Sequence, residues 1–151
     1  MMMGTAETVP SGHLVLYRIR DRDVVGLKAV RHGKDHVNHY FVPLELISPI
    51  TVAYLDDTAP LHDCNDHFSL KLDQLVIEPP IAVGTILANA TGTYIKACEA
   101  TKGIISFVYV NLDSGELRRR QERQISAIYR WTLTCIGIDP RREPQMAGSL
   151  S

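Results

Sequence analysis

The chain has 151 residues, an apolar content of 45% and a formal net charge of −1 at pH 7. This length supports a single domain whose core needs neither a metal ion nor disulfides. The near-neutral charge gives no general attraction to nucleic acid, and no apolar run approaches the roughly 18 residues of a membrane-spanning segment.

Cysteine usage and the N-terminus bear on the compartment. The three cysteines, Cys64, Cys98 and Cys135, are odd in number, widely spaced and without a CxxC motif. This pattern argues against a disulfide framework and predicts a reducing, cytoplasmic location. The first residues, MMMGTAETVPSGH, lack the basic and apolar regions of a signal peptide.

Both ends of the chain are predicted to be flexible. Residues 1–12 contain Gly, Pro, Ser and Thr without an apolar period, and residues 139–151 form a polar tail. Neither segment can bury enough apolar surface to offset the entropy of ordering it. Residues 13–138 between them show no repeat and no linker, and are predicted to form one domain.

The middle of the chain is predicted to form short β-strands. Its segments are rich in β-branched and aromatic residues and are separated by compact polar turns. Short strands at such regular spacing predict an all-β domain, a single antiparallel β-sandwich or barrel of roughly eight to ten strands. The predicted strands are His13–Arg20, Val24–Val30, His36–Val42, Ile50–Leu55, Phe68–Ile77, Thr85–Ala90, Thr93–Ala100, Ile104–Asn111 and Ile125–Thr134.

Two turns set the predicted register of the first three strands. A two-residue turn at Asp21-Arg22 would pair Arg20 with Asp23, an opposite-charge pair of the favourable kind. A Gly33-Lys34 turn would pair Lys28 with His39. Because side chains alternate along a strand, one face would then carry Leu14, Leu16, Val25, Leu27, Ala29, Tyr40 and Val42.

The segment Arg31–Glu45 holds three of the six histidines, His32, His36 and His39. The predicted hairpin places His36 on one face and His32 and His39 on the other. A zinc ion holds its ligands at about 2 Å, so the three imidazoles cannot share one ion within this hairpin. A helix would place all three on one face, but the content of VNHYFV favours a strand.

A second polar cluster, LHDCNDHF, supplies further metal-ligand chemistry. His62 and His67, with Asp66 or Cys64, could coordinate a divalent metal, and His36 or His39 could join them across the fold. The corresponding function is a metal-dependent, cupin-like β-barrel enzyme. The chain lacks the closely spaced HxH and following Glu of the cupins, and a loop of simple turns and Asx caps is the alternative.

The segment Arg118–Arg123, RRRQER, is the strongest local charge feature. Guanidinium groups bind phosphate or carboxylate in a bidentate manner, so an anionic partner is indicated. Glu116 and Glu122 dilute the charge, which makes a solvated edge strand the alternative and nucleic acid the less favoured partner. Single-stranded nucleic acid could nevertheless stack on Tyr129 and Trp131. The candidate binding residues are Arg118, Arg119, Arg120 and Arg123.

Residues 113–131 allow two interpretations. Asp113 and Glu116 could cap a helix that continues through LRRRQERQISAIYRW. The Val- and Tyr-rich run before Asp113 and the Asp113-Ser114-Gly115 turn favour a hairpin instead. We expect the hairpin.

Several predicted strands are apolar on both faces. Pairing Thr101 with Ile104 places Ile95, Ala97, Val108 and Val110 on one face, and Tyr94, Cys98, Ile105, Phe107 and Tyr109 on the other. A loop, another subunit or a ligand must cover the second face, because large apolar surfaces are seldom left open. We therefore expect a homo-oligomer buried through a sheet face. The leading function is an oligomeric binding or assembly module without catalysis.

Overall fold

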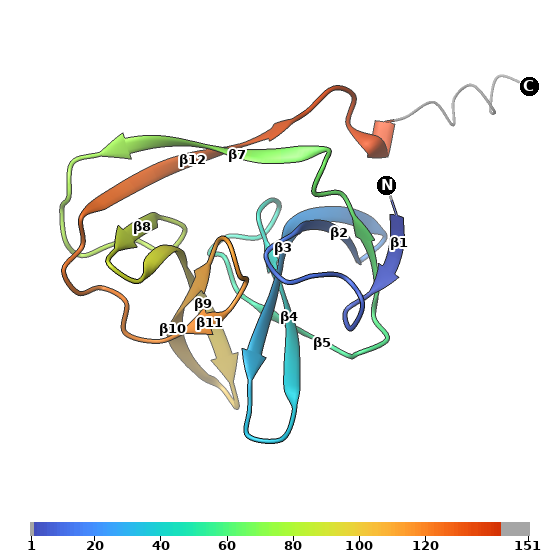
Figure 1. Ribbon diagram of the computed structural model, residues 1–151, viewed down its shortest axis with the longest axis horizontal. Helices are drawn as coiled ribbons and strands as arrows, with labels where there is room; N and C mark the ends of the chain where they lie inside the picture. Colours follow the sequence, from blue (N-terminus) through green and yellow to red (C-terminus); the bar gives the residue numbers. More distant parts are fainter. Residues whose placement is uncertain (1, 143–151) are drawn as a thin grey trace, which may run out of the picture.

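The structure is a computed structural model that describes residues 2–142. These residues form two six-stranded antiparallel sheets that pack as a sandwich, which confirms the predicted all-β class (Figure 1). The first sheet contains β1 (Met2–Thr5), β2 (Leu14–Ile19), β3 (Arg22–His32), β4 (Val37–Pro43), β5 (Ala53–Leu55) and β6 (Pro60–Asp63). The second contains β7 (Phe68–Leu75), β8 (Ile86–Asn89), β9 (Gly92–Thr101), β10 (Ile104–Asn111), β11 (Leu117–Arg118) and β12 (Ala127–Cys135), and a 3-10 helix, η1 (Pro140–Arg142), follows.

Each of the nine predicted strands overlaps an observed strand, and three observed strands were not predicted. The missed strands β1, β6 and β11 are two to four residues long, too short for an alternating pattern to be recognised. β11 pairs with β10, Leu117 opposite Val110 and Arg118 opposite Tyr109. The expected hairpin after Asn111 is therefore confirmed.

The prediction of a flexible N-terminal segment is wrong for residues 2–12. β1 pairs with β6 along its whole length, and Ala6 and Val9 behind it are buried. At the other end, Arg141 donates a hydrogen bond to the carbonyl oxygen of Asp23 at 3.0 Å. The start of the predicted polar tail is thus held against the first sheet, and residues 143–151 of that tail lie outside the described residues.

The first hairpin turn is formed by Arg20-Asp21, not Asp21-Arg22 as predicted. Both residues have a positive φ, 48° and 66°, as tight two-residue turns between twisted strands require. Arg18 rather than Arg20 therefore lies opposite Asp23, and their side chains form an ion pair at 3.5 Å. The pairing differs from the prediction by two residues, so every side chain keeps its predicted face.

The second hairpin has a four-residue loop, residues 33–36, closed by a hydrogen bond from Gly33 N to His36 O. Lys28 consequently pairs with Phe41 instead of His39. This shift is again two residues, and the predicted faces hold. In the second sheet the predicted pairing of Thr101 with Ile104 is confirmed.

The main core lies between the two sheets. The residues predicted to share a face of the first sheet pack here against one face of β8, β9 and β10. The opposite faces of both sheets are covered in part by other residues of the same chain, while Ile105 and Phe107 on the second sheet are exposed. The cluster on the first sheet consists of Ala6, Val9, Val15, Val24, Phe41, Leu55 and Leu61. The cluster on the second sheet consists of Ile81, Leu87, Tyr94, Tyr109, Ile125 and Ile128.

The two sheets repeat one topology. The first sheet has the order β1-β6-β2-β3-β4-β5, and the second has β7-β12-β8-β9-β10-β11, so adding six to each strand number converts one into the other. The prediction that the chain has no internal repeat is therefore wrong at the level of topology. The two repeats also share a short sequence motif, Leu27-Lys28-Ala29 in β3 and Ile95-Lys96-Ala97 at the equivalent place in β9.

The repeats interlock through their longest strands, β3 and β9. Val30 N of β3 donates a hydrogen bond to Gly115 O of the second repeat at 2.8 Å. Cys98 N of β9 donates to Ile50 O at 2.8 Å, and Cys98 O accepts from Val52 N at 2.9 Å. Each long strand therefore binds the segment that leads into the fifth strand of the other repeat.

An ion pair joins equivalent positions of β3 and β9. Arg31 and Glu99 each stand three residues after the lysine of the shared motif. The guanidinium group of Arg31 donates two hydrogen bonds of 2.7 Å to the Glu99 carboxylate, which is nearly buried. These hydrogen bonds hold the pKa of Glu99 below its usual range. Bidentate geometry of this kind is the strong form of an ion pair.

The motif lysine of the first repeat, Lys28, is buried at 1% exposure. Its Nζ lies 2.9 Å from Nδ1 of His39 and 3.3 Å from Oγ of Ser11, and no carboxylate of residues 2–142 forms an ion pair with it. Burial without a counter-charge disfavours the ammonium form. It lowers the pKa of Lys28 from 10.5 to about 8.

This burial predicts a pH-dependent stability. Between pH 8 and pH 10.5 the folded chain releases the Lys28 proton while the unfolded chain retains it. The unfolded state then binds more protons, so the free energy of unfolding of the wild type should rise with pH relative to Lys28→Met. Urea denaturation of both proteins across this window measures the difference. A difference that does not change with pH would contradict the assignment.

Candidate functional site

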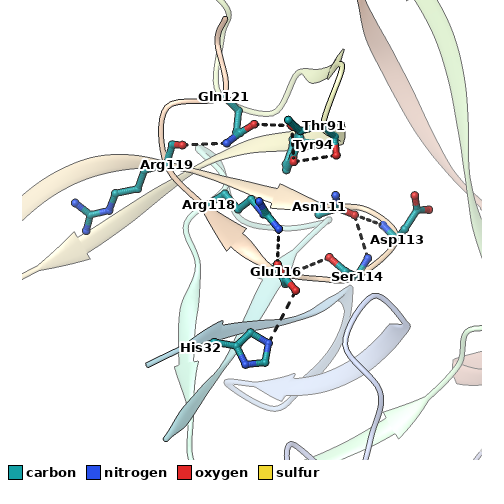
Figure 2. Close-up of polar contacts among 10 residues, drawn as sticks. All are labelled: His32, Thr91, Tyr94, Asn111, Asp113, Ser114, Glu116, Arg118, Arg119 and Gln121. Carbon is teal, nitrogen blue, oxygen red and sulfur yellow. Dashed lines mark hydrogen bonds and ion pairs between the residues drawn. The ribbon is translucent and has the colours of Figure 1, made fainter. Parts of the chain in front are cut away.

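The turn before β11 is built by Asn111 and closed by Gly115 (Figure 2). Oδ1 of Asn111 accepts hydrogen bonds from the main-chain N–H groups of Asp113 and Ser114 at 2.8 and 3.0 Å. Gly115 has a φ of 74°, and a Cβ atom there would lie 2.6 Å from the carbonyl oxygen of Lys28. Only glycine therefore fits where the turn meets the first repeat.

Glu116 follows this turn and connects the two repeats. Its carboxylate accepts a hydrogen bond from Nη2 of Arg118 at 2.8 Å. Its other oxygen lies 4.0 Å from Nε2 of His32 at the end of β3 (Figure 2). His32 thus lies beside the carboxylate that pairs with Arg118, the first residue of the arginine-rich segment.

Gln121 anchors the middle of the arginine-rich segment to the β8–β9 turn. Its side-chain oxygen accepts a hydrogen bond from Oγ1 of Thr91 at 3.0 Å, and its main-chain oxygen accepts one from Nδ2 of Asn89 at 2.9 Å. Oγ1 of Thr91 is also 2.9 Å from the hydroxyl of Tyr94 (Figure 2). The Gln121 amide group closes the loop by donating to Arg119 O at 3.1 Å.

Glu122 is a second anchor and points into the protein. Its carboxylate pairs with Nζ of Lys96 at 2.6 Å and accepts a hydrogen bond from the hydroxyl of Tyr109. Burial alone would raise the pKa of Glu122, but these two hydrogen bonds hold it below its usual range. Lys96, the motif lysine of the second repeat, also donates to Ile81 O at 2.7 Å and lies 4.3 Å from the ring centre of Phe107.

The two anchors leave the arginines on the surface. Arg118 pairs with Glu116, and the other three form no ion pair with any residue of the described range 2–142. The main chain at Arg120 is left-handed, with a φ of 58°. Figure 2 shows the Arg119 side chain extending away from the polar network. We call the exposed set Arg118, Arg119, Arg120 and Arg123 the arginine surface.

The metal-ligand candidates are dispersed. His62 lies on β6 opposite Leu16 of β2, and His67 lies in the turn between β6 and β7. His36 is in the β3–β4 loop, while His39 is on β4. No group of three His, Cys, Asp or Glu side chains within residues 2–142 is arranged to hold a metal ion. The grouping that a metal-dependent enzyme requires is therefore not found in this part of the chain.

Sequence reasoning paired Lys28 with His39 but missed the polar contacts that run from the buried Lys28 through His39 to the exposed Asp57. The His39 side chain is 12% exposed, and its Nε2 lies 3.6 Å from a carboxylate oxygen of Asp57. Burial, and then the charge of Lys28, lower the pKa of His39. The signal in the sequence was a single lysine inside the apolar run VVGLKAV, which predicts a buried amine that needs a partner.

Two aromatic residues considered for base stacking are engaged elsewhere. Tyr129 and Trp131 lie on β12 and pack against the main core. The Trp131 indole N–H also donates a hydrogen bond to Gly84 O. These rings therefore contribute to the interior of the sandwich and do not form a stacking platform beside the arginine surface.

Comparison with known proteins identifies no relative. No protein-family model matches the chain, and no significant match is found among curated proteins or solved structures. None of the secondary structure in residues 2–142 is a helix of the length and apolarity needed to cross a bilayer.

The inward anchor at Glu122 should be much more important for stability than the outward pair at Glu116. Glu122→Ala leaves the nearly buried Lys96 ammonium without a counter-charge, which should cost about 3 kcal/mol of unfolding free energy. Glu116→Ala removes an exposed pair and should cost at most about 1 kcal/mol. Urea denaturation measures both, and equal losses would show that Glu122 is not a buried anchor.

Proposed function

We propose that the protein is a non-catalytic binding module that recognises an acidic segment of a protein partner through the arginine surface. The observation that carries the proposal is the inward orientation of Gln121 and Glu122. These two anchors fix the main chain of the loop, so Arg120 and Arg123 on either side are presented to solvent from an ordered segment.

Ordering in the free protein favours binding. A flexible loop loses conformational entropy when it binds, whereas a loop that is already fixed loses less. Here hydrogen bonds from Asn89, Thr91 and Lys96 hold the segment before any partner arrives. The remaining cost falls mainly on the arginine side chains themselves, and planar guanidinium groups suit bidentate contact with carboxylates.

The charge distribution favours an acidic protein segment over nucleic acid. Four exposed guanidinium groups stand on one short segment, and among residues 2–142 the ion pairs formed with them are limited to that of Arg118 with Glu116, so the local charge is positive. The chain as a whole has a net charge of −1, which does not attract an extended polyanion. A short acidic segment needs only a local patch, whereas an extended nucleic acid strand gains affinity from phosphate contacts along a longer basic surface.

The proposal is tested with a fluorescein-labelled octaglutamate peptide in an anisotropy titration at low salt. The wild type should bind it, and Arg120→Gln/Arg123→Gln should weaken binding about tenfold, because each exposed charge pair contributes up to roughly 1 kcal/mol. Rising salt should weaken binding of the wild type more than binding of the double variant.

The matched control is Arg130→Gln, an exposed arginine on β12 outside the arginine surface. It should bind the peptide like the wild type. Tighter binding of a single-stranded oligothymidine with the same arginine dependence would identify nucleic acid instead. Absence of binding to either probe would contradict the proposal.

Light scattering of the free protein tests the predicted self-association, and a monomer would contradict that expectation.

A further inference from the structure

A hollow of about 520 Å³ lies beside the first hairpin turn of the chain. It is far larger than a water site and falls within the range of pockets that hold small organic ligands. Its lining residues come from the β2–β3 hairpin and from the turn after β4. They are Ile19, Arg20, Arg22, Val24, Leu46 and Ile47.

The lining combines two chemistries. Four of its side chains are apolar, and the other two, Arg20 and Arg22, carry guanidinium groups. No carboxylate lines the hollow, and neither arginine forms an ion pair or a side-chain hydrogen bond with any residue between 2 and 142. The nearby Asp23 carboxylate pairs with Arg18 instead. Two arginines therefore line a largely apolar hollow, and neither has an ion-pair partner within residues 2–142.

A polar hollow of about 430 Å³ adjoins the first and shares Arg22 and Leu46 with it. Here the charges are matched. Arg141 pairs with Glu45 and Asp139, and Glu45 also accepts a hydrogen bond from Val25 N. The uncompensated positive charge is therefore concentrated on the Arg20 and Arg22 side, and an anion would bind there.

The equivalent hairpin turns of the two repeats differ in their contacts. In the second repeat Thr91 of the equivalent turn, Ala90-Thr91, donates a hydrogen bond to the Gln121 side chain. In the first repeat no side chain among residues 2–142 forms an equivalent hydrogen bond with Arg20 or Asp21. Leu46 reaches this region with a φ of 67°, a strained conformation for a leucine, and its side chain is 64% exposed. An exposed apolar side chain is thus held beside the hollow at a cost in backbone energy.

We propose that this hollow binds a small organic anion whose carboxylate or phosphate group pairs with Arg20 and Arg22. The apolar body of the ligand lies against Ile19, Leu46 and Ile47. The ligand needs both a charged head group and an apolar body. The guanidinium groups orient the head group, and the apolar wall removes the body from water. This site is separate from the arginine surface and does not depend on it.

Amide chemical shifts of the full-length, isotope-labelled protein test the proposal with four probes: octanoate, octyl phosphate, 1-octanol and inorganic phosphate. Octanoate or octyl phosphate should produce saturable shifts at residues 19–24 and 46–47, and the stronger of the two identifies the head group. Octanol and inorganic phosphate should each bind at least tenfold more weakly, since each lacks one half of the ligand.

Two variants complete the test. Arg20→Gln/Arg22→Gln should weaken octanoate or octyl phosphate binding at least tenfold, while Arg130→Gln, an exposed arginine on β12 outside the lining, should bind like the wild type. Unchanged affinity in the double variant, or equal affinity for octanol, would overturn the proposal. So would the absence of saturable shifts with both anionic probes while the spectrum shows a folded protein.

Discussion

The exchange of main-chain hydrogen bonds between the two repeats is the constraint on which the rest of the structure depends. Each long central strand, β3 or β9, binds the segment leading into the fifth strand of the other repeat. The Arg31–Glu99 ion pair joins equivalent positions of these strands. The main core receives residues from both sheets. Neither repeat therefore buries its inner face without the other.

The main-chain hydrogen bonds between the repeats also position the proposed binding surface. Val30 of the first repeat binds Gly115, which fixes the turn leading to Glu116 and β11. The segment that follows is tied to the second repeat by Gln121 and Glu122. The arginine surface is thus supported by both repeats, and its rigidity depends on their contact. The Arg20 and Arg22 hollow lies beside the equivalent turn of the first repeat, to which no side chain within residues 2–142 is hydrogen-bonded in this way.

Much of the fold could be predicted from alternation of apolar residues, because alternation reports which face is buried. The faces of β2, β3 and β4 were predicted correctly although two turns were misplaced, since both errors were two residues. The repeat was missed because the two halves share a topology but little sequence, and LKA and IKA are too short a similarity to reveal it. The anchoring roles of Gln121 and Glu122 depend on residues far away in the sequence, such as Asn89 and Lys96, which no local pattern brings together.

The central claim, that the two repeats form one interlocked body, is tested most directly by native-state hydrogen exchange. The amides of Val52 and Cys98 donate between repeats, whereas the amide of Leu44 donates to Val25 O within the first repeat. We predict that all three exchange only through global unfolding, with the same free energy and the same dependence on denaturant. Exchange of Val52 and Cys98 through a smaller opening, with Leu44 still protected, would contradict the account.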